Sequence, residues 1–432
     1  MHPVAREHNA LVYHCAPMAY TPENSRLDPG SKATLMFLAA LVALGPLSVD
    51  MYLPAMPAMQ QAFNTDIVHM HFTLSAYLWG FAVFHLACGP LADRFGRKPV
   101  LLGGTGLFVL ASAGCALANS VEELTTYRFM QGVGACVGPT LARTITRDIF
   151  GPKGAARALS LIAMLMALAP AVAPGLGGLM LRYVEWPAVF VFLSVYGSIV
   201  MVIIGFRIPE TLAEPQSLRP GNIAANYLVL LRDPVFLPIA AASALVYAGL
   251  MAYLACSGFV FIDMLGVPVE YFGFIFLSSV FGYMGGSAVS ARLAVRYATS
   301  ELLLLGGVIA TVAVLSMLPL HLLAPTSILA LILPMSFYSA ALGLVLPQAM
   351  AMAMEHFPRI AATNSSLFGF LQMGLSAVIT VAVGSVLVSS PLPMIITMAV
   401  TQVLALLLMV YGRAQSKKHY PIHPLSTEPD SP

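Results

Sequence analysis

The chain has 432 residues, of which 59% are hydrophobic and only 9% are charged, and its formal net charge is +2. Soluble globular domains are about 45–50% apolar and about 25% charged. This composition, with a mean hydropathy of +0.84, therefore indicates an all-α integral membrane protein and not a soluble one. The small net charge gives no indication of a nucleic-acid partner.

Twelve apolar runs are long enough to cross a bilayer, which takes about 20 residues per helix. The first six predicted spans are 34–57, 71–91, 99–119, 123–143, 158–181 and 186–206. The second six are 236–262, 270–292, 302–323, 327–352, 362–388 and 391–412. Breaks at Ala324-Pro325-Thr326 and at Ser390-Pro391 divide the two longest stretches that lack Asp, Glu, Lys and Arg.

The cations predict the orientation. If both chain ends lie inside, 19 of the 21 Lys and Arg residues fall in inside segments, and only Arg182 lies outside. Positive residues are concentrated on the cytoplasmic side of membrane proteins, so both termini are expected there. The predicted domains are a cytoplasmic tail at 1–31, a six-helix lobe at 32–206, a cytoplasmic linker at 207–235, a second six-helix lobe at 236–412 and a cytoplasmic tail at 413–432. The linker is expected to contain an amphipathic helix from Asn222 to Leu231.

A polar loop between the second and third spans is the most distinctive motif, with four charges within six residues. Its candidate functional residues are Gly89, Asp93, Arg94, Gly96, Arg97 and Lys98. Gly96 can adopt a backbone conformation closed to other residues, and Asp93 can cap a helix start or pair with a cation. The alternative is a solvated turn whose cations serve only to set topology.

Two charges fall well inside predicted spans, away from the span ends, where an ionised group costs about 2.5–3.5 kcal/mol and is a functional candidate. Asp50 lies in the first span and Arg128 in the fourth. Their similar expected depth permits either an ion pair or two charges facing one wet cavity. The structural alternatives are a fixed pair that only locks the helices, and a helix-end turn formed by Asp50, Tyr52 and Pro54.

Two further motifs surround these charges. Gln131 and Gly132 follow Arg128 in a run that allows close helix packing. The fifth span contains Pro170, Pro174, Gly177 and Gly178, which must bend or thin that helix. An ordinary Gly- and Pro-rich membrane helix is the alternative.

Together these motifs, with Ser48-Val49-Asp50-Met51-Tyr52-Leu53-Pro54, resemble the major facilitator superfamily. Within it they are similar to the twelve-helix drug:proton antiporters of the bicyclomycin/chloramphenicol-resistance (Bcr/CflA) branch. The resemblance implies two six-helix lobes, a conformational role for the loop, proton coupling by Asp50 and Arg128, and an antiporter motif in the fifth helix. Ala173 stands where that motif usually has glycine, and Val42 stands where some related exporters carry a second acidic residue.

Other polar residues in the spans suit a cavity for an amphiphilic cargo. The predicted cavity residues are Tyr52, Tyr77, Gln131, Tyr247, Gln348 and Gln372. The sequence shows no catalytic triad, phosphate loop or metal-ligand pattern, so no enzyme activity, cofactor or metal is expected. The five cysteines lie mostly in apolar runs and predict packing residues without a disulfide framework.

The sequence therefore predicts a monomeric secondary transporter of the bacterial inner membrane that exports amphiphilic small molecules in exchange for protons. Two alternatives stay open. One is a proton-coupled exporter or uptake symporter of an endogenous metabolite, and the other is a membrane scaffold or receptor that transports nothing.

Overall fold

The computed structural model describes residues 32–146, 148–149, 162, 169–212, 220–355, 357, 360–387 and 390–419. These residues form helices and turns and contain no β-strand. The helices up to the central linker are α1 (Lys32–Asp50), η2 (Leu53–Ala55), α2 (Met56–Ala62), α3 (Ile67–Phe95), α4 (Arg97–Ala116), α5 (Val121–Ala135), α7 (Ala169–Tyr183) and α8 (Pro187–Arg207). Those that follow are α9 (Pro220–Arg232), α10 (Phe236–Ser257), η3 (Gly258–Met264), η4 (Val269–Tyr271), α11 (Phe272–Leu293), α12 (Thr299–Leu323), α13 (Leu329–Glu355), α14 (Ala361–Gly384) and α15 (Leu392–His419).

The described helices include ten segments that are long and apolar enough to cross a membrane, and each coincides with a predicted span. The other two predictions behave differently. The fourth, 123–143, falls on α5, a turn residue at Cys136 and the helical residues 137–146, which together extend beyond the predicted span at both ends. Of the fifth, 158–181, the structure describes residue 162 and residues 169–181, and the latter belong to α7. The protein is thus a multi-pass, all-helical membrane protein.

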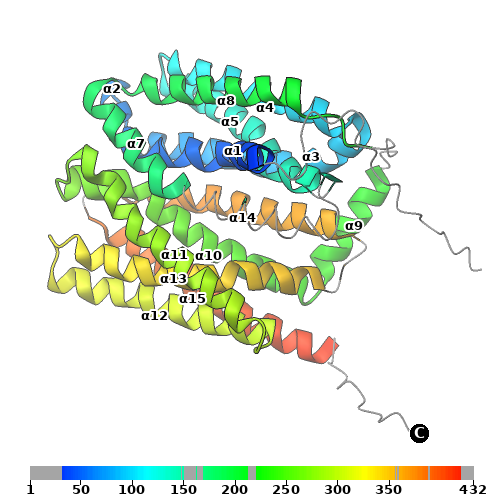
Figure 1. The fold of residues 1–432 in the computed structure, drawn as a ribbon. Helices are drawn as coiled ribbons and strands as arrows, with labels where there is room; N and C mark the ends of the chain where they lie inside the picture. The colour runs from blue at the N-terminus through cyan, green and yellow to red at the C-terminus, as the bar shows by residue number, and fades with distance from the viewer. Residues whose placement is uncertain are drawn as a thin grey trace, which may run out of the picture.

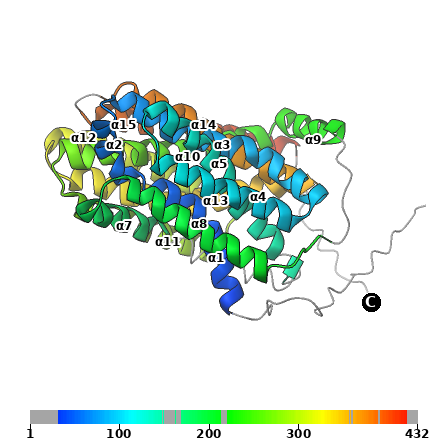
Figure 2. The same cartoon turned by 90° about the horizontal axis from the view of Figure 1, so that it is seen from above.

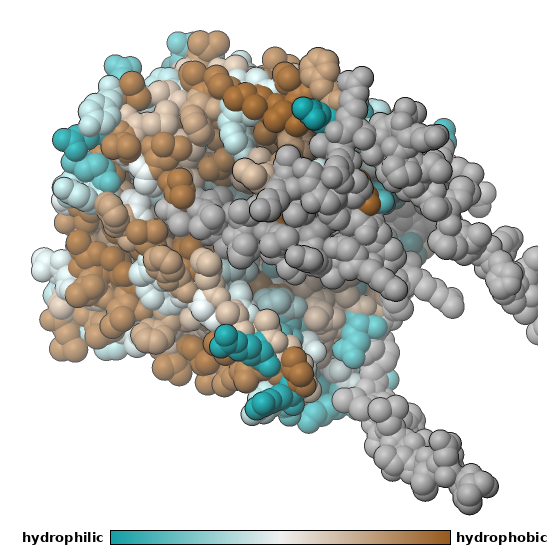
Figure 3. Space-filling view, in the orientation of Figure 1, coloured by the Kyte–Doolittle hydropathy of each residue, from teal (hydrophilic) through white to brown (hydrophobic). Residues whose placement is uncertain are grey.

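Helix α8 shows why these helices need a bilayer. One of its stripes is buried in the protein and consists of Val189, Phe190, Leu193, Gly197, Val200 and Ile204. The other is exposed and equally apolar, and consists of Val191, Val195, Ile199, Val202 and Phe206. A helix that is apolar all round requires an apolar surrounding on its outer face as well. Figure 3 shows hydrophobic residues spread in this way over the flank of the described surface.

The helices before α9 gather on one side of the molecule and those after it on the other (Figure 1). The two groups are called here the N-terminal and C-terminal helices. They meet where α3 packs along α14 and where α7 packs along α11. Helix α9 lies across one end of the bundle (Figures 1 and 2), so that end is called the α9 side and the other the opposite side. Division into two six-helix lobes at residues 206 and 236 stays a prediction.

Short loops on the opposite side begin their helices with side-chain caps. The Asp66 carboxylate accepts a hydrogen bond of 2.8 Å from the His69 backbone N–H at the start of α3. Hydrogen bonds from the His69 backbone and ring hold the pKa of Asp66 below its ordinary value. Ser120 accepts a hydrogen bond from the Glu123 N–H at the start of α5, and the Glu123 carboxylate accepts one from the Asn119 N–H. These caps satisfy backbone donors that a helix start leaves free.

Candidate functional site

Arg128 is completely buried between two aromatic rings. Its guanidinium carbon lies 4.3 Å from the ring centre of Tyr52, which precedes η2, and 4.4 Å from that of Tyr77 in α3. A cation over aromatic faces is attracted by their π electrons, by about 2 kcal/mol or more when water is excluded. Tyr52 is fixed in turn by a hydrogen bond between its hydroxyl and that of Thr73. The arginine therefore holds η2 and α3 against α5.

The polar contacts of Arg128 are with neutral groups. Its Nη1 donates to the Ser48 carbonyl oxygen at 3.2 Å and to Gln131 Oε1 at 2.5 Å. Gln131 Nε2 then donates to Ser112 Oγ in α4 at 2.8 Å. In the part of the chain that the structure describes, Nε and Nη2 of Arg128 have no hydrogen-bond partner. Gly132 allows α5 to pack this closely on α3, because a Cβ at position 132 would collide with the Tyr77 backbone.

Asp50 is the last residue of α1 and is 5% exposed. Its Oδ2 has no hydrogen-bond partner among the described residues, and the side chain lines a cavity. Arg128 instead reaches the Ser48 carbonyl two residues earlier and does not line that cavity. The described residues thus show neither the Asp50–Arg128 ion pair nor the shared cavity that the sequence permitted. Tyr77, one of the two rings that enclose Arg128, lines the cavity in its place.

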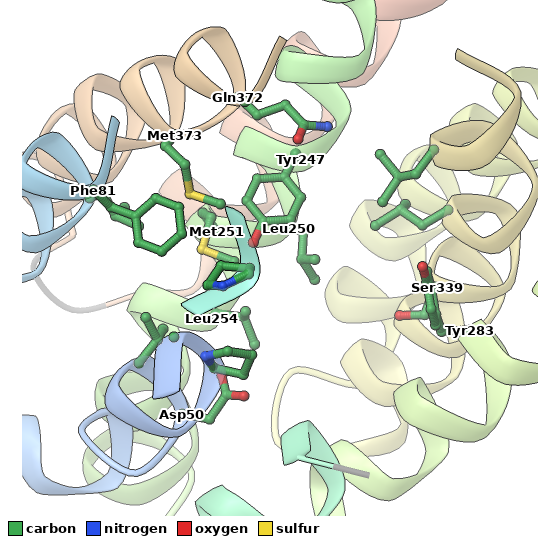
Figure 4. A pocket seen from close by; sticks show the side chains of 18 of the residues that line it. Asp50, Phe81, Tyr247, Leu250, Met251, Leu254, Tyr283, Ser339, Gln372 and Met373 are labelled. Carbon is green, nitrogen blue, oxygen red and sulfur yellow. The ribbon is translucent and has the colours of Figure 1, made fainter. Parts of the chain in front are cut away.

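The cavity has a volume of about 640 Å³ and lies between the N-terminal and C-terminal helices. In Figure 4, Asp50 lies at one end of it, Tyr247, Met251 and Met373 lie together, and Ser339 and Tyr283 face them. Its lining is mainly aliphatic, aromatic and methionine side chains, with hydroxyl and amide groups between them. A cavity of this size and composition suits an amphiphilic small molecule.

Three of the six predicted cavity residues line the cavity, namely Tyr77, Tyr247 and Gln372. The other three do not line it and make contacts within the protein. Tyr52 and Gln131 belong to the Arg128 cluster, and Gln348 Nε2 donates to Ser290 Oγ at 3.0 Å in the C-terminal helices.

Sequence reasoning missed several lining residues. Leu250, Met251 and Leu254 follow Tyr247 at spacings of three, four and seven residues, which places all four on one face of α10. This pattern was visible in the sequence, but the same spacing is found on any buried face. Arg143 also lines the cavity, although the sequence identified it only as an inside cation.

The two helix groups are in tight contact on the opposite side. Gly175 in α7 touches Gly273 in α11, where a Cβ added at Gly273 would lie 2.6 Å from the Gly175 nitrogen. Nearby, Arg182 Nη1 lies 3.7 Å from Glu270 Oε1. The predicted fifth-helix residues take part as follows: Gly177 lies against Met51, Gly178 lies against Val269, Pro174 lies inside α7, and the side chain of Pro170 lies outside the described residues.

Helices α3 and α14 continue this contact. The buried ring of His71 places Nδ1 3.1 Å from the Thr380 carbonyl oxygen, and Ser75 Oγ donates to the Ala377 carbonyl at 2.8 Å. Gly384 leaves room for the His71 ring. The cavity is therefore closed on the opposite side and extends toward the α9 side, where Met350 and Arg143 line it.

The polar loop forms an ion-pair network on the α9 side. Arg97 Nη1 lies 3.2 Å from Asp93 Oδ1, and Arg97 Nε lies 2.8 Å from Asp148 Oδ2. Asp148 also accepts a hydrogen bond of 2.9 Å from Thr211 Oγ1. Of the two roles expected for Asp93, the structure shows pairing with a cation. Arg94 is exposed, and a Cβ added at Gly89 would meet nothing within 4 Å; neither residue joins this network in the described part of the chain.

Glu210 caps the third membrane helix from a distant part of the chain. Its carboxylate accepts hydrogen bonds from the N–H groups of Arg97 (2.9 Å) and Lys98 (3.1 Å), the first residues of α4. Lys98 Nζ donates to the Gly205 carbonyl at 2.8 Å. Gly96, with φ of +99°, turns the chain so that these N–H groups face Glu210. The negative charge is stabilised at a helix N-terminus.

Within the described residues, no cluster of three or more His, Cys, Asp or Glu side chains could hold a metal ion. The cavity with its acidic lining residue and the loop network suit a membrane transporter. Residues 38–381 match the Major Facilitator Superfamily, and the chain belongs to that family. The predicted fold class is thereby confirmed.

The similar proteins of this family point to one branch. The chain is 28% identical over 401 residues to a bicyclomycin resistance protein homolog of Haemophilus influenzae, which covers 90% of this chain and 98% of the relative. It is 31% identical to the uncharacterised transporter YdgK of Bacillus subtilis (82% and 89%) and 29% identical to multidrug resistance protein D of Escherichia coli (78% and 85%). These relatives agree with the Bcr/CflA resemblance.

Solved structures show the fold. A D-xylose–proton symporter superposes with a TM-score of 0.69 at 15% identity, covering 88% of this chain and 97% of that one. A bacterial homologue of the lysosomal transporter Spinster, in an inward-facing unoccupied conformation, gives 0.68 at 17% identity, covering 90% and 98%. Both likenesses concern the arrangement of helices alone.

Proposed function

We propose that the protein is a monomeric, proton-coupled exporter of amphiphilic drugs or related small molecules in the bacterial inner membrane. The observation that carries this proposal is the cavity of about 640 Å³, closed on the opposite side and provided with one carboxylate, Asp50. The names of the relatives, which refer to resistance to bicyclomycin and to several drugs, support the same cargo class.

Asp50 is the proposed site of proton exchange. Its Oδ2 has no internal partner among the described residues, so a proton or a cargo group is free to occupy that position. A site that binds one or the other, but not both together, couples the two movements as exchange requires. Arg128 is a positioning residue in this scheme, because it fixes the Ser48 carbonyl in the last turn of α1.

The two ends of the bundle have different proposed roles. The α9 side is cytoplasmic, since it carries the Arg97 network and most of the cations. The contacts of α7 with α11 seal the outer end, while the loop residues Asp93 and Arg97 latch the inner helix ends in one state. Alternating access then moves the helix groups about the cavity.

The test is export by the full chain in an efflux-deficient bacterium and in inside-out vesicles. We expect lowered susceptibility to bicyclomycin and ethidium, and ethidium uptake into inside-out vesicles that an imposed proton gradient drives. Asp50→Asn at matched membrane levels is the control. Proton-driven ethidium movement into intact cells would indicate the alternative of an uptake symporter. The lack of any ethidium flux would support the alternative of a scaffold that transports nothing.

Orientation is tested separately. A cysteine introduced near Arg219 in the linker should react with an impermeant maleimide in inside-out vesicles but not in intact cells. The linker residues 213–219 lie outside the described residues, so this prediction depends on the charge distribution alone. Labelling from outside the cell would reverse the proposed topology.

A further inference from the structure

Arg143 is an exposed arginine inside the cavity. It lies in the helical residues 137–146 that continue α5, and its side chain lines the cavity together with His85. In the part of the chain that the structure describes, its guanidinium takes part in no hydrogen bond and no ion pair. This differs from Arg97, whose side chain contacts two carboxylates.

The acidic residue of the cavity is too far away to neutralise Arg143. Asp50 lies near the level of Arg128, which contacts the Ser48 carbonyl. Arg143 follows Arg128 by fifteen residues, or roughly 22 Å along a helix at 1.5 Å per residue. The described lining residues carry no other formal negative charge. The α9-side half of the cavity therefore presents a positive group without a counter-charge.

The surroundings of Arg143 favour a particular partner. A guanidinium offers parallel N–H donors that match a carboxylate in a bidentate pair, and such pairs are stronger away from bulk water. His85 adds a polar atom, since its buried Nδ1 has no hydrogen-bond partner among the described residues. The part of the lining that comes from the C-terminal helices α10, α11, α13 and α14 contributes apolar, hydroxyl and amide side chains without formal charge.

We propose that the cavity also takes amphiphiles that carry a carboxylate, and that Arg143 binds this carboxylate while the apolar body lies against Tyr247, Met251 and Met373. The inference adds an anionic cargo class to the site in the proposed function and rests on that function for transport. Its binding component is independent of transport. The competing explanation is that Arg143 is one more inside cation that sets topology or contacts lipid phosphate.

Three fluorescent probes on one scaffold separate these explanations. Dansylglycine carries a carboxylate, dansylglycinamide is its neutral counterpart, and dansylethylenediamine is a cation. The full-length protein is titrated with each in detergent, by the change in dansyl emission. We expect the carboxylate probe to bind about tenfold or more tightly than the amide, because a charge-assisted hydrogen bond is stronger than one between neutral groups.

The variants assign the preference to one residue. Arg143→Gln should lower affinity for dansylglycine about tenfold and leave that for dansylglycinamide within about twofold, while Arg143→Lys should keep part of the preference. Arg207→Gln is the matched control, because Arg207 is an exposed cation at the end of α8 that does not line the cavity. It should bind all three probes as the wild type does.

Several results would overturn the inference. They are equal affinities of the wild type for the carboxylate and amide probes, an unchanged preference in Arg143→Gln, an equal loss in Arg207→Gln, or no binding of any probe. Thermal melts of each variant show whether it folds. If Arg143→Gln does not fold, the probe preference of Arg143→Lys decides whether Arg143 binds the carboxylate. Vesicles that accumulate neither ethidium nor the dansyl probes while the Arg143-dependent preference persists would refute the proposed export and leave the binding inference standing.

Discussion

The glycine pair Gly175 and Gly273 allows a sharp test of the seal on the opposite side. The two residues belong to different helix groups and touch through their backbones. They are not equivalent. A Cβ added at Gly175 would lie 3.7 Å from the Gly273 Cα, which is an ordinary van der Waals distance. A Cβ added at Gly273 would lie 2.6 Å from the Gly175 nitrogen and closer still to its Cα.

The cost of Gly273→Ala follows from this geometry. Backbone atoms cannot rotate away as a flexible side chain can, so α7 and α11 must separate by roughly 1 Å to reach normal contact. Overpacking of this kind costs about 1–3 kcal/mol. If the cost falls on the sealed state alone, the equilibrium between sealed and open states shifts by about 5–150-fold. Gly175→Ala should shift it little.

The assay reads access to the cavity from each side of the membrane. Ser339→Cys, a lining residue of α13, is placed in a chain whose other cysteines are replaced. An impermeant maleimide is then applied to intact cells and, separately, to inside-out vesicles, and the extent of labelling of the cysteine is compared. We expect Gly273→Ala to raise labelling in intact cells several-fold and to slow transport, with Gly175→Ala close to the parent.

Equal labelling of the two alanine variants would refute the reasoning, since both place the same methyl group at the same interface. So would a Gly273→Ala protein that is less stable but labels as the parent does, because the substitution would then act on folding and not on the seal.

Three further predictions concern carboxylates. Asp50→Asn should fold but lose proton-driven export, and its cargo binding should depend less on pH; retained proton-coupled flux with unchanged pH dependence would place coupling elsewhere. Asp93→Asn should slow turnover more than it lowers the melting temperature, because Arg97 keeps its contact with Asp148; normal transport at matched levels would support a simple solvated turn. Glu210→Gln should speed hydrogen exchange of the Arg97 and Lys98 amides, which lose a charged acceptor; unchanged exchange would show that the cap contributes little.

The sequence predicted the helices well because each span must be apolar along its whole length, whatever it packs against. The buried charges were also visible, since ionised groups are rare in such segments. For these features local composition is sufficient. Asp50 lines the cavity without Arg128, so neither arrangement expected for the two charges is present among the described residues.

Contacts between distant segments were not predictable in the same way. The sequence places Glu210 113 residues beyond Arg97, and nothing local shows that its carboxylate caps α4. Arg128 was expected to pair with Asp50 or to face a cavity with it, and Tyr52 was expected to line the cavity. The two side chains instead pack on each other, because α5 and the start of η2 meet in space. Arg143 has the sequence features of a topology cation, and only the fold places it in the cavity.

The cavity divides its formal charges unevenly, since Asp50 and Arg143 both come from the N-terminal helices and the described C-terminal lining is neutral. Selection for a new cargo can therefore act on one half of the protein while Asp50 and Arg143 stay untouched. A substitution such as Met251→Val or Met373→Leu would change the shape available to a drug at no electrostatic cost. In a resistance gene, this arrangement would let the drug spectrum broaden by single mutations.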